Sequence, residues 1–219
     1  MITLYGFGRV NGKVIGYTRD LRALWALEET GLPYRVEALD HGGGETKTDA
    51  YRRISPFEQI PVIDDGGFVV AESGAVVLYI AEKAGKLMPR DVQGRTHVTQ
   101  WCFAALNTLE PPIFQIALVD FFSDGATGTQ RRPELVKWAE HCLTGIDRQL
   151  SRHAHIAGAE FTVADILTVT VLREVRKSDL LDGFPRVKDY AARCQQRPAW
   201  RRTLTDYERR LGAPAGSAQ

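Results

Sequence analysis

Residues 59–73 read QIPVIDDGGFVVAES, and this stretch decides the fold. Two short apolar runs, 61–64 and 68–71, lie on either side of Asp65-Gly66-Gly67, a turn sequence typical of a β-hairpin. Pro61 has no amide hydrogen to give to a sheet, so it belongs at an edge or a bend where its strand begins. The sequence therefore predicts an antiparallel strand pair whose first strand starts at a proline.

The residues around this hairpin alternate between strand and helix patterns. Residues 2–7 form a short apolar run, 19–30 carry apolar side chains at helical spacing, and 34–39 alternate apolar with charged side chains. A helix follows the hairpin at 74–84, and Ser73 can cap its start. A strand–helix–strand unit followed by a hairpin and a helix predicts a mixed four-stranded sheet, because crossover strands are parallel and hairpin strands antiparallel.

Beyond residue 89 the pattern is helical, apart from short turns. The expected helices are 94–109, continuing after Pro111-Pro112 to 122, then 133–153, 163–177, 186–196 and 199–211, with a break at 125–128. We therefore predict two domains, α/β over 1–85 and all-α over 90–211. A linker at 86–89 joins them, and a flexible tail follows at 212–219.

The composition narrows the function classes. The 28 basic and 27 acidic residues give a net charge of +1, so no global positive field favours nucleic acid as a partner. No run approaches the roughly 18–20 uninterrupted apolar residues of a membrane span, and the N-terminus lacks a signal-peptide pattern. Cys102, Cys142 and Cys194 form neither a CxxC pair nor a zinc-type cluster, so we expect a cytoplasmic protein without a metal site.

Two features of the opening stretch suit a peptide ligand. If the Ile60–Pro61 bond is cis, the Ile60 backbone turns outward and can pair with an extended peptide, whereas a trans bond makes Pro61 an ordinary strand start. At Glu72-Ser73, a helix N-terminus with a hydroxyl and a carboxylate offers partners for both charges of an amino acid end. The simpler alternative is that Ser73 only caps its helix while Glu72 is solvated.

Thr162 and Asp165 match a capping box in the second half of the chain, with Asp in place of the usual Glu. This pattern indicates a folding element at a helix start. Replacing Asp165 by Ala is expected to lower stability by roughly 1 kcal/mol or more, with little direct effect on chemistry.

Taken in order, these motifs resemble the glutathione S-transferase family. The segments that carry the resemblance are 22–29, 31–34, Gln59-Ile60-Pro61, Glu72-Ser73, 86–89, 161–166, 184–187 and 197–200. They cover nearly the whole chain and correspond to the family's first helix, second strand, binding loop, interdomain linker, signature helix and last helices. The resemblance implies a thioredoxin-like domain of βαβ-ββα order beside a helical bundle domain, usually as a homodimer.

The resemblance also implies where glutathione binds as a co-substrate. Glu72 and Ser73 would take its γ-glutamyl end, the Ile60 backbone would pair with its cysteinyl unit ahead of a cis Pro61, and Gln59 would reach toward its glycyl carboxylate. Such an enzyme must ionise the glutathione thiol, because a thiol of pKa about 8.5 is only about 3% thiolate at pH 7.

The activating hydroxyl is predicted at one of three positions. Counting back from Arg22 puts Thr18 at the family's serine position with Tyr17 beside it, and counting forward from the first strand puts Tyr5 near the family's tyrosine position. We favour Thr18, then Tyr17, then Tyr5, with Arg19 nearby to steady an anion. Thr18 also suits a plain helix N-cap. No cysteine lies in the first half of the chain, which excludes a cysteine-type mechanism.

The acceptor pocket is expected between the domains. Its candidate residues are Trp101, Phe103, Asn107, Phe114 and Phe122, although an aromatic stripe at helical spacing is also typical of a core. We predict a glutathione transferase that activates the thiolate for attack on small apolar electrophiles. The alternatives are glutathione-dependent peroxide or disulfide reduction by the same thiolate, and a non-catalytic binding or regulatory protein, which the long loop at 6–16 favours.

Overall fold

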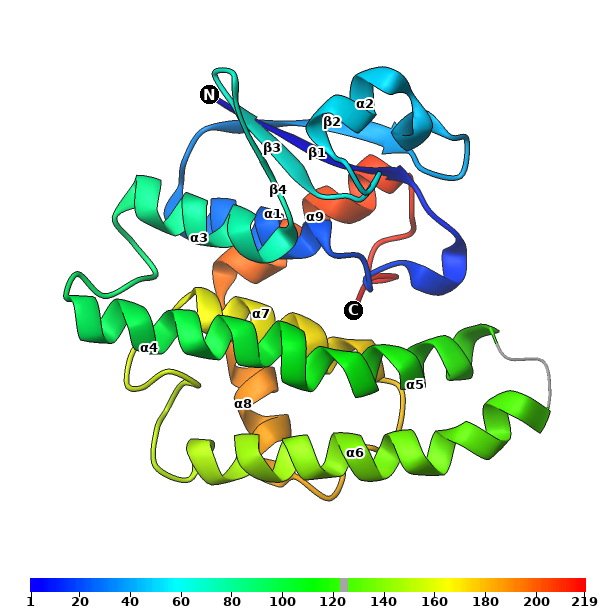
Figure 1. Cartoon of the computed structure of the whole chain (residues 1–219), viewed down its shortest axis with the longest axis vertical. Helices are drawn as coiled ribbons and strands as arrows, with labels where there is room; N and C mark the ends of the chain where they lie inside the picture. The colour runs from blue at the N-terminus through cyan, green and yellow to red at the C-terminus, as the bar shows by residue number, and fades with distance from the viewer. Residues whose placement is uncertain (123–125) are drawn as a thin grey trace. The chain divides into compact units, whose positions relative to one another are not determined.

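The computed structural model describes residues 1–122 and 126–219, apart from the side chains of 126–129 (Figure 1). Contacts between residues divide it into two compact units: unit 1 consists of 1–87 and 197–219, and unit 2 of 88–196. The predicted division differs at its C-terminal end, because the structure joins the last helix and the tail to the α/β unit. The predicted break at 125–128 falls partly on 123–125, which lie outside the described residues.

Unit 1 is built on the predicted mixed four-stranded sheet. Its strands are β1 (Ile2–Arg9), β2 (Tyr34–Asp40), β3 (Val62–Asp65) and β4 (Phe68–Ala71), in the spatial order β2-β1-β3-β4. The pair β1–β2 is parallel, and the pairs β1–β3 and β3–β4 are antiparallel. The first strand runs two residues further than predicted, into the segment expected to be loop. A short 3₁₀ turn, η1 (Gly12–Val14), follows it.

The helices of unit 1 cover the two faces of this sheet (Figure 1). One face carries α1 (Asp20–Thr30), α3 (Ser73–Ala84) and α9 (Pro198–Leu211), and the other carries η2 (Glu45–Lys47) and α2 (Asp49–Ile54). Gly31 and Gly85 end α1 and α3 in the left-handed conformation that glycine adopts without a steric penalty, as the sequence predicts. The apolar core lies under the first face, where Leu4, Leu24 and Ile80 are fully buried.

The last helix belongs to unit 1 because α1 supplies partners along its length. Trp25 and Trp200 pack with ring centroids 4.6 Å apart. Two acidic residues near the end of α1, where negative charge opposes the helix dipole, are paired with arginines of the last helix and its approach: Glu29 with Arg197 and Glu28 with Arg202, both at 2.6 Å.

The C-terminal residues 212–219, which the sequence predicts as a flexible tail, fold back onto α9. The Glu208 carboxylate accepts hydrogen bonds from the backbone N–H groups of Gly216 and Ala218, at 2.9 Å and 2.8 Å. Ala218 is fully buried against Gly16, where an added Cβ would lie 2.4 Å from the Ala218 carbonyl oxygen. Only glycine fits at position 16 in this arrangement, which also has a positive φ of 79°.

Helices and helical turns are the regular elements of unit 2 in its described residues, apart from an isolated β-bridge between His155 and Gly158. Its elements are α4 (Val92–Phe103), the π-helical turn η3 (Ala104–Leu109), α5 (Glu110–Phe122), α6 (Ala126–Leu150), α7 (Val163–Leu172), the 3₁₀ turn η4 (Arg173–Val175) and α8 (Pro185–Gln195). Every residue of α7 is buried, so this helix is the centre of the unit.

The predicted interruption at Pro111-Pro112 is not seen. The Glu110 N–H donates to the Ala105 carbonyl, five residues back, and this wider turn lets the helix continue past two residues that have no amide hydrogen. The resulting run, Val92–Phe122, is long and apolar enough by composition to cross a membrane, but 44% of its most apolar window is buried within the structure. Buried core helices of soluble proteins can have the same length and apolar composition.

The capping box at the start of α7 is confirmed. The Asp165 carboxylate accepts the Thr162 N–H, and it also accepts the Ile156 N–H and the Tyr190 hydroxyl, each at 2.8 Å. Asp165 is fully buried, so these donors replace the water that its charge would otherwise require. The residue thus ties three segments of unit 2 together.

Candidate functional site

The Ile60–Pro61 peptide bond, at the approach to β3, is cis. The Gln59 carbonyl is held from behind by the hydroxyls of Tyr51 and Ser55, at 2.9 Å and 3.0 Å. Within the described residues, no hydrogen bond involves the N–H or C=O of Ile60. An extended peptide therefore finds a backbone donor and acceptor here, which is the requirement for β-augmentation.

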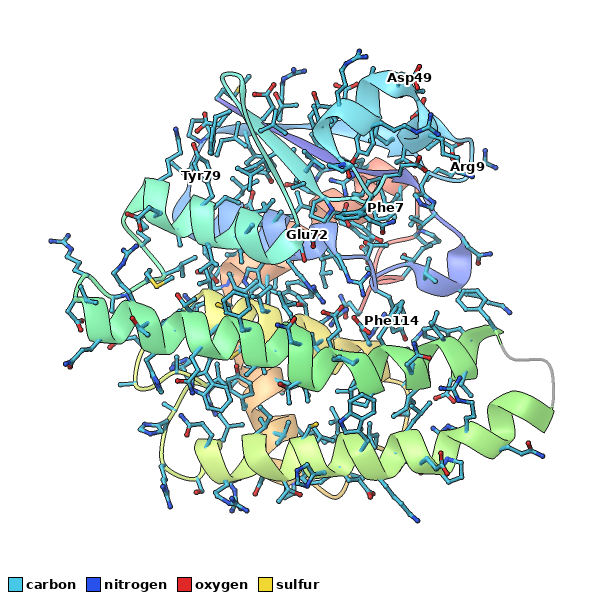
Figure 2. The ribbon with its side chains drawn as sticks, in the orientation of Figure 1. Phe7, Arg9, Asp49, Glu72, Tyr79 and Phe114 are labelled. Atoms are coloured by element: carbon cyan, nitrogen blue, oxygen red, sulfur yellow. The ribbon has the colours of Figure 1, made fainter. Side chains whose placement is uncertain are left out.

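The start of α3 lies beside this segment, where β4 runs into the helix at the labelled Glu72 (Figure 2). Val62 at the start of β3 pairs with Ala71 at the end of β4, so the Ile60–Pro61 segment and the start of α3 adjoin the same end of this strand pair. Glu72 has a φ of 70° and stands at the N-cap position, with an exposed side chain. The helix offers backbone N–H groups and the positive end of its dipole at this point.

Ser73 is the first residue of α3 and does not cap it, contrary to the simpler alternative. Its side chain is buried, with 7% of the residue exposed. The Arg22 guanidinium of α1 donates a hydrogen bond to the Ser73 hydroxyl oxygen at 3.1 Å, and Arg22 is only 2% exposed. A buried cation therefore stands behind the helix N-terminus.

Thr18 lies just before α1, within a chain of hydroxyl groups. Its hydroxyl is 2.6 Å from an Asp20 carboxylate oxygen and 2.8 Å from the Tyr207 hydroxyl of α9. An ionised carboxylate only accepts hydrogen bonds, so Thr18 donates its single proton to Asp20 and accepts from Tyr207. The Tyr207 oxygen in turn accepts the Gly16 N–H at 3.4 Å. Thr18 is not the N-cap of α1, because Arg19 occupies that position.

Asp20 is the charged centre of this cluster and is fully buried. Its second carboxylate oxygen accepts hydrogen bonds from the Arg210 guanidinium at 2.7 Å and from the Phe7 N–H at 3.1 Å. Arg210 also donates to the Phe7 carbonyl at 2.8 Å. The Asp20–Arg210 pair therefore joins the end of β1, the start of α1 and the end of α9. Burial, followed by the negative charge of Asp20, raises the pKa of the Tyr207 hydroxyl above its usual value.

The other predicted activating residues lie apart from one another. Tyr5 projects from β1 toward the face that α2 covers and packs edge-to-face on Tyr51, with ring centroids 6.0 Å apart. Tyr17 adjoins Thr18, and its hydroxyl oxygen is buried. The structure therefore brings Tyr17, Thr18 and Arg19 to the start of α1 and places Tyr5 in an apolar cluster on the other face.

The predicted acceptor residues all belong to the run from α4 to α5 in unit 2. Phe103 is 59% exposed and Phe122 49% exposed, and Asn107 is exposed as well. Trp101 and Phe114 are half-buried. Large exposed aromatic side chains are typical of contact surfaces more than of a core, but the role of these residues stays a prediction.

Sequence reasoning missed the charged residues behind both hydroxyls. Arg22 interrupts the apolar face of a helix, which is a signal that could have singled it out, because arginine is rarely buried without a partner. Asp20, Tyr207 and Arg210 gave no such signal, since their contacts join segments about 190 residues apart. Among the described residues, no group of three or more His, Cys, Asp or Glu side chains could hold a metal ion.

Comparison with known proteins agrees with this geometry. Family models match residues 13–82, as the glutathione S-transferase N-terminal domain, and 111–198, as its C-terminal domain. Glutathione S-transferase F9 of Arabidopsis thaliana is 29% identical over 85% of this chain and 92% of its own. Disulfide-bond oxidoreductase YfcG of Escherichia coli is 30% identical over 79% of this chain and 84% of its own. A solved structure of a Pseudomonas fluorescens glutathione transferase family member with two glutathione molecules bound is 27% identical, with a TM-score of 0.82 over 93% of this chain and 92% of its own.

Proposed function

The chain belongs to the glutathione S-transferase family and is a glutathione transferase, and we propose that unit 1 holds glutathione along the segment from Gln59 to Ser73. In this proposal the cysteinyl unit pairs with the Ile60 backbone, and the γ-glutamyl end meets Glu72, Ser73 and the N-terminus of α3. The Gln59 side chain reaches the glycyl carboxylate after leaving the Phe57 carbonyl, to which its amide now donates at 3.0 Å.

One observation carries the proposal: three binding features lie at the end of the sheet where β1 and β4 end and β3 begins. Ile60 lies two residues before Val62 and Ser73 two residues after Ala71, and Val62 pairs with Ala71. Val62 also pairs with Tyr5, two residues before Phe7, whose N–H donates to Asp20 beside Thr18. This end of unit 1 therefore offers an unpaired backbone at Ile60, a helix N-terminus for a carboxylate and a second helix start for the sulfur.

Activation of the thiol is proposed at the start of α1. Thr18 donates its proton to Asp20 in the structure, and a hydrogen bond to a charged group contributes about 1.5–3 kcal/mol. If Thr18 turned that proton toward a thiolate, the free energy lost with the hydrogen bond to Asp20 would equal the free energy gained at the sulfur. We therefore propose that the Tyr17 hydroxyl, Arg19 and the positive end of α1 stabilise the thiolate, and that Tyr5 serves as packing.

The acceptor is proposed to be a small apolar electrophile, with the exposed aromatic side chains of α4 and α5 as its contacts. A homodimer is proposed on the exposure of Phe57, at 74%, in the loop between α2 and β3, because an apolar side chain of this size on a surface loop favours a protein contact. A cytoplasmic location and a role in detoxification are proposed from family membership.

A second candidate function is glutathione-dependent disulfide reduction. The relatives named disulfide-bond oxidoreductases, at 30% and 27% identity, favour it, as do neighbours solved with two glutathione molecules bound. The same thiolate would attack a disulfide sulfur, and a second glutathione would complete the exchange.

The test compares turnover of a halogenated aromatic, a hydroperoxide and a small organic disulfide with glutathione. Transferase function predicts conjugation of the aromatic, and disulfide turnover without conjugation selects the second candidate. Ser73→Ala is expected to weaken glutathione binding. Ser151→Ala is the control, because in the part of the chain that the structure describes that exposed hydroxyl bonds only to the Arg148 carbonyl of α6. Absence of glutathione binding by the wild-type protein would contradict both functions.

A further inference from the structure

The buried hydrogen bond between Arg22 and Ser73 fixes which partner donates. A guanidinium has five N–H donors and no acceptor, so the Ser73 oxygen must accept in the 3.1 Å bond. The hydroxyl proton of Ser73 is then left for another acceptor. Because Ser73 opens α3, that proton joins the N–H groups of the helix start as one more donor.

Thr18 has the opposite arrangement, which makes the comparison informative. Its charged partner is the Asp20 carboxylate, which only accepts, so Thr18 donates inward and offers a ligand only an oxygen lone pair. Both hydroxyls are anchored by buried charges, Asp20 at 0% exposure and Arg22 at 2%. The sign of the buried charge decides whether each hydroxyl faces a ligand as a donor or as an acceptor.

We propose that Arg22 is a positioning residue that presets Ser73 as a hydrogen-bond donor and thereby makes this site select a carboxylate over a neutral group of the same shape. It acts through Ser73 and not by touching the ligand. The inference rests on the proposed function, in which the carboxylate is that of the γ-glutamyl end of glutathione. A buried guanidinium close to the helix N-terminus adds positive potential in the same direction.

The experiment is a double-mutant cycle on ligand binding. Kd is measured by titration calorimetry for wild type, Arg22→Met, Ser73→Ala and the double variant, each with glutathione and with an analogue whose γ-glutamyl α-carboxylate is an amide. We expect each single variant to weaken glutathione binding about tenfold, and the double variant to be no weaker than either one. Wild type is expected to prefer glutathione to the amide, and Arg22→Met to lose most of that preference.

Conservative and surface variants separate positioning from general stability. Arg22→Lys keeps a donor-only cation and is expected to recover binding in part, whereas Arg22→Gln, which can also accept a hydrogen bond, recovers less. Arg202→Met removes an arginine whose side chain is 54% exposed and paired with Glu28, so binding is expected to stay as in wild type. Thermal melting of each variant shows whether it is folded, and the Lys and Gln variants carry the test if Arg22→Met is not.

The outcomes distinguish this inference from the proposed function. Wild-type binding of glutathione with losses that add across Arg22 and Ser73, or with no loss at Arg22, overturns the positioning role and leaves the function standing. An unchanged preference for the carboxylate in every Arg22 variant overturns it as well. Wild-type protein that binds neither ligand overturns both.

Discussion

Replacing Thr18 by Val tests whether this hydroxyl activates the glutathione thiol. Valine keeps the branched shape and removes the O–H that Asp20 accepts at 2.6 Å. Because Asp20 is fully buried, the lost hydrogen bond is one to a charged group, contributing about 1.5–3 kcal/mol. We expect the free energy of unfolding to fall by about 2 kcal/mol, since Tyr207 also loses its acceptor.

The expected effect of Thr18→Val on the pKa of the glutathione thiol is much smaller than its effect on the free energy of unfolding. Lowering a thiol pKa by two units needs about 2.7 kcal/mol. To donate to the sulfur, the Thr18 hydroxyl would have to break its hydrogen bond to Asp20. The free energy gained at the thiolate and the free energy lost at the carboxylate are of the same size, so they nearly cancel. The pKa of bound glutathione in Thr18→Val is therefore expected to lie within about half a unit of the wild-type value.

The assay is a pH titration of the ultraviolet thiolate absorbance of the glutathione complex, beside urea unfolding of the same variants. Thr18→Ser is the matched control, because it keeps the hydroxyl and is expected to keep both stability and thiol pKa. Tyr17→Phe is expected to raise the thiol pKa without a comparable loss of stability. A rise of one unit or more in Thr18→Val, with Tyr17→Phe unchanged, would refute this assignment.

Four further outcomes can be measured. Asp165→Ala leaves three buried donors without their acceptor. Urea unfolding is therefore expected to show that the free energy of unfolding falls by about 3 kcal/mol or more, with glutathione affinity unchanged. A fall of less than about 1 kcal/mol would contradict the role of Asp165 as a shared buried acceptor. Burial raises the pKa of Cys102 to about 12 and also raises the pKa of the less buried Cys142, so Cys102 should be alkylated more slowly than Cys142 in the native protein. The free energy of unfolding should fall as pH rises above about 8.5, because the Cys102 thiol ionises there in the unfolded chain but not in the folded one. Equal alkylation rates for the two cysteines would argue against the burial of Cys102. Phe57→Ser should shift the protein toward a monomer by size-exclusion with light scattering, whereas an unchanged dimer would remove Phe57 from the interface. Ending the chain after Leu211 removes the two backbone donors that Glu208 binds and should lower the melting temperature by several degrees, and unchanged melting would show that these contacts contribute nothing.

Local patterns were enough to predict the strands, the first helices and the capping box. The turn at Asp65-Gly66-Gly67 and the stops at Gly31 and Gly85 depend on residues a few positions apart, and the structure confirms them. Ser73 was placed one position wrong, as a cap, because sequence alone does not show that Glu72 adopts a left-handed φ. The cis bond at Pro61 likewise followed from the family resemblance and not from composition.

The placement of the last helix could not be predicted in the same way. Periodicity over 199–211 gives a helix with one apolar face but does not say which element covers that face. Its partner is α1, through Trp25 on Trp200 and through ion pairs that join residues about 170 positions apart. Nothing local to the helix distinguishes this contact from packing within the helical unit. The contacts group 197–219 with unit 1, whereas the sequence analysis extends the helical domain to 211.

The same limit applies to the chemistry of the two hydroxyls. Sequence identifies Ser73 and Thr18 as polar residues at helix starts, and by residue type they are nearly interchangeable. What separates them is the charge buried behind each one: a guanidinium forces the first to donate outward, and a carboxylate forces the second to donate inward. Because a carboxylate ligand and a thiolate both require donors, only the first hydroxyl is preset for an anion, and the direction of a single proton assigns the two residues different roles.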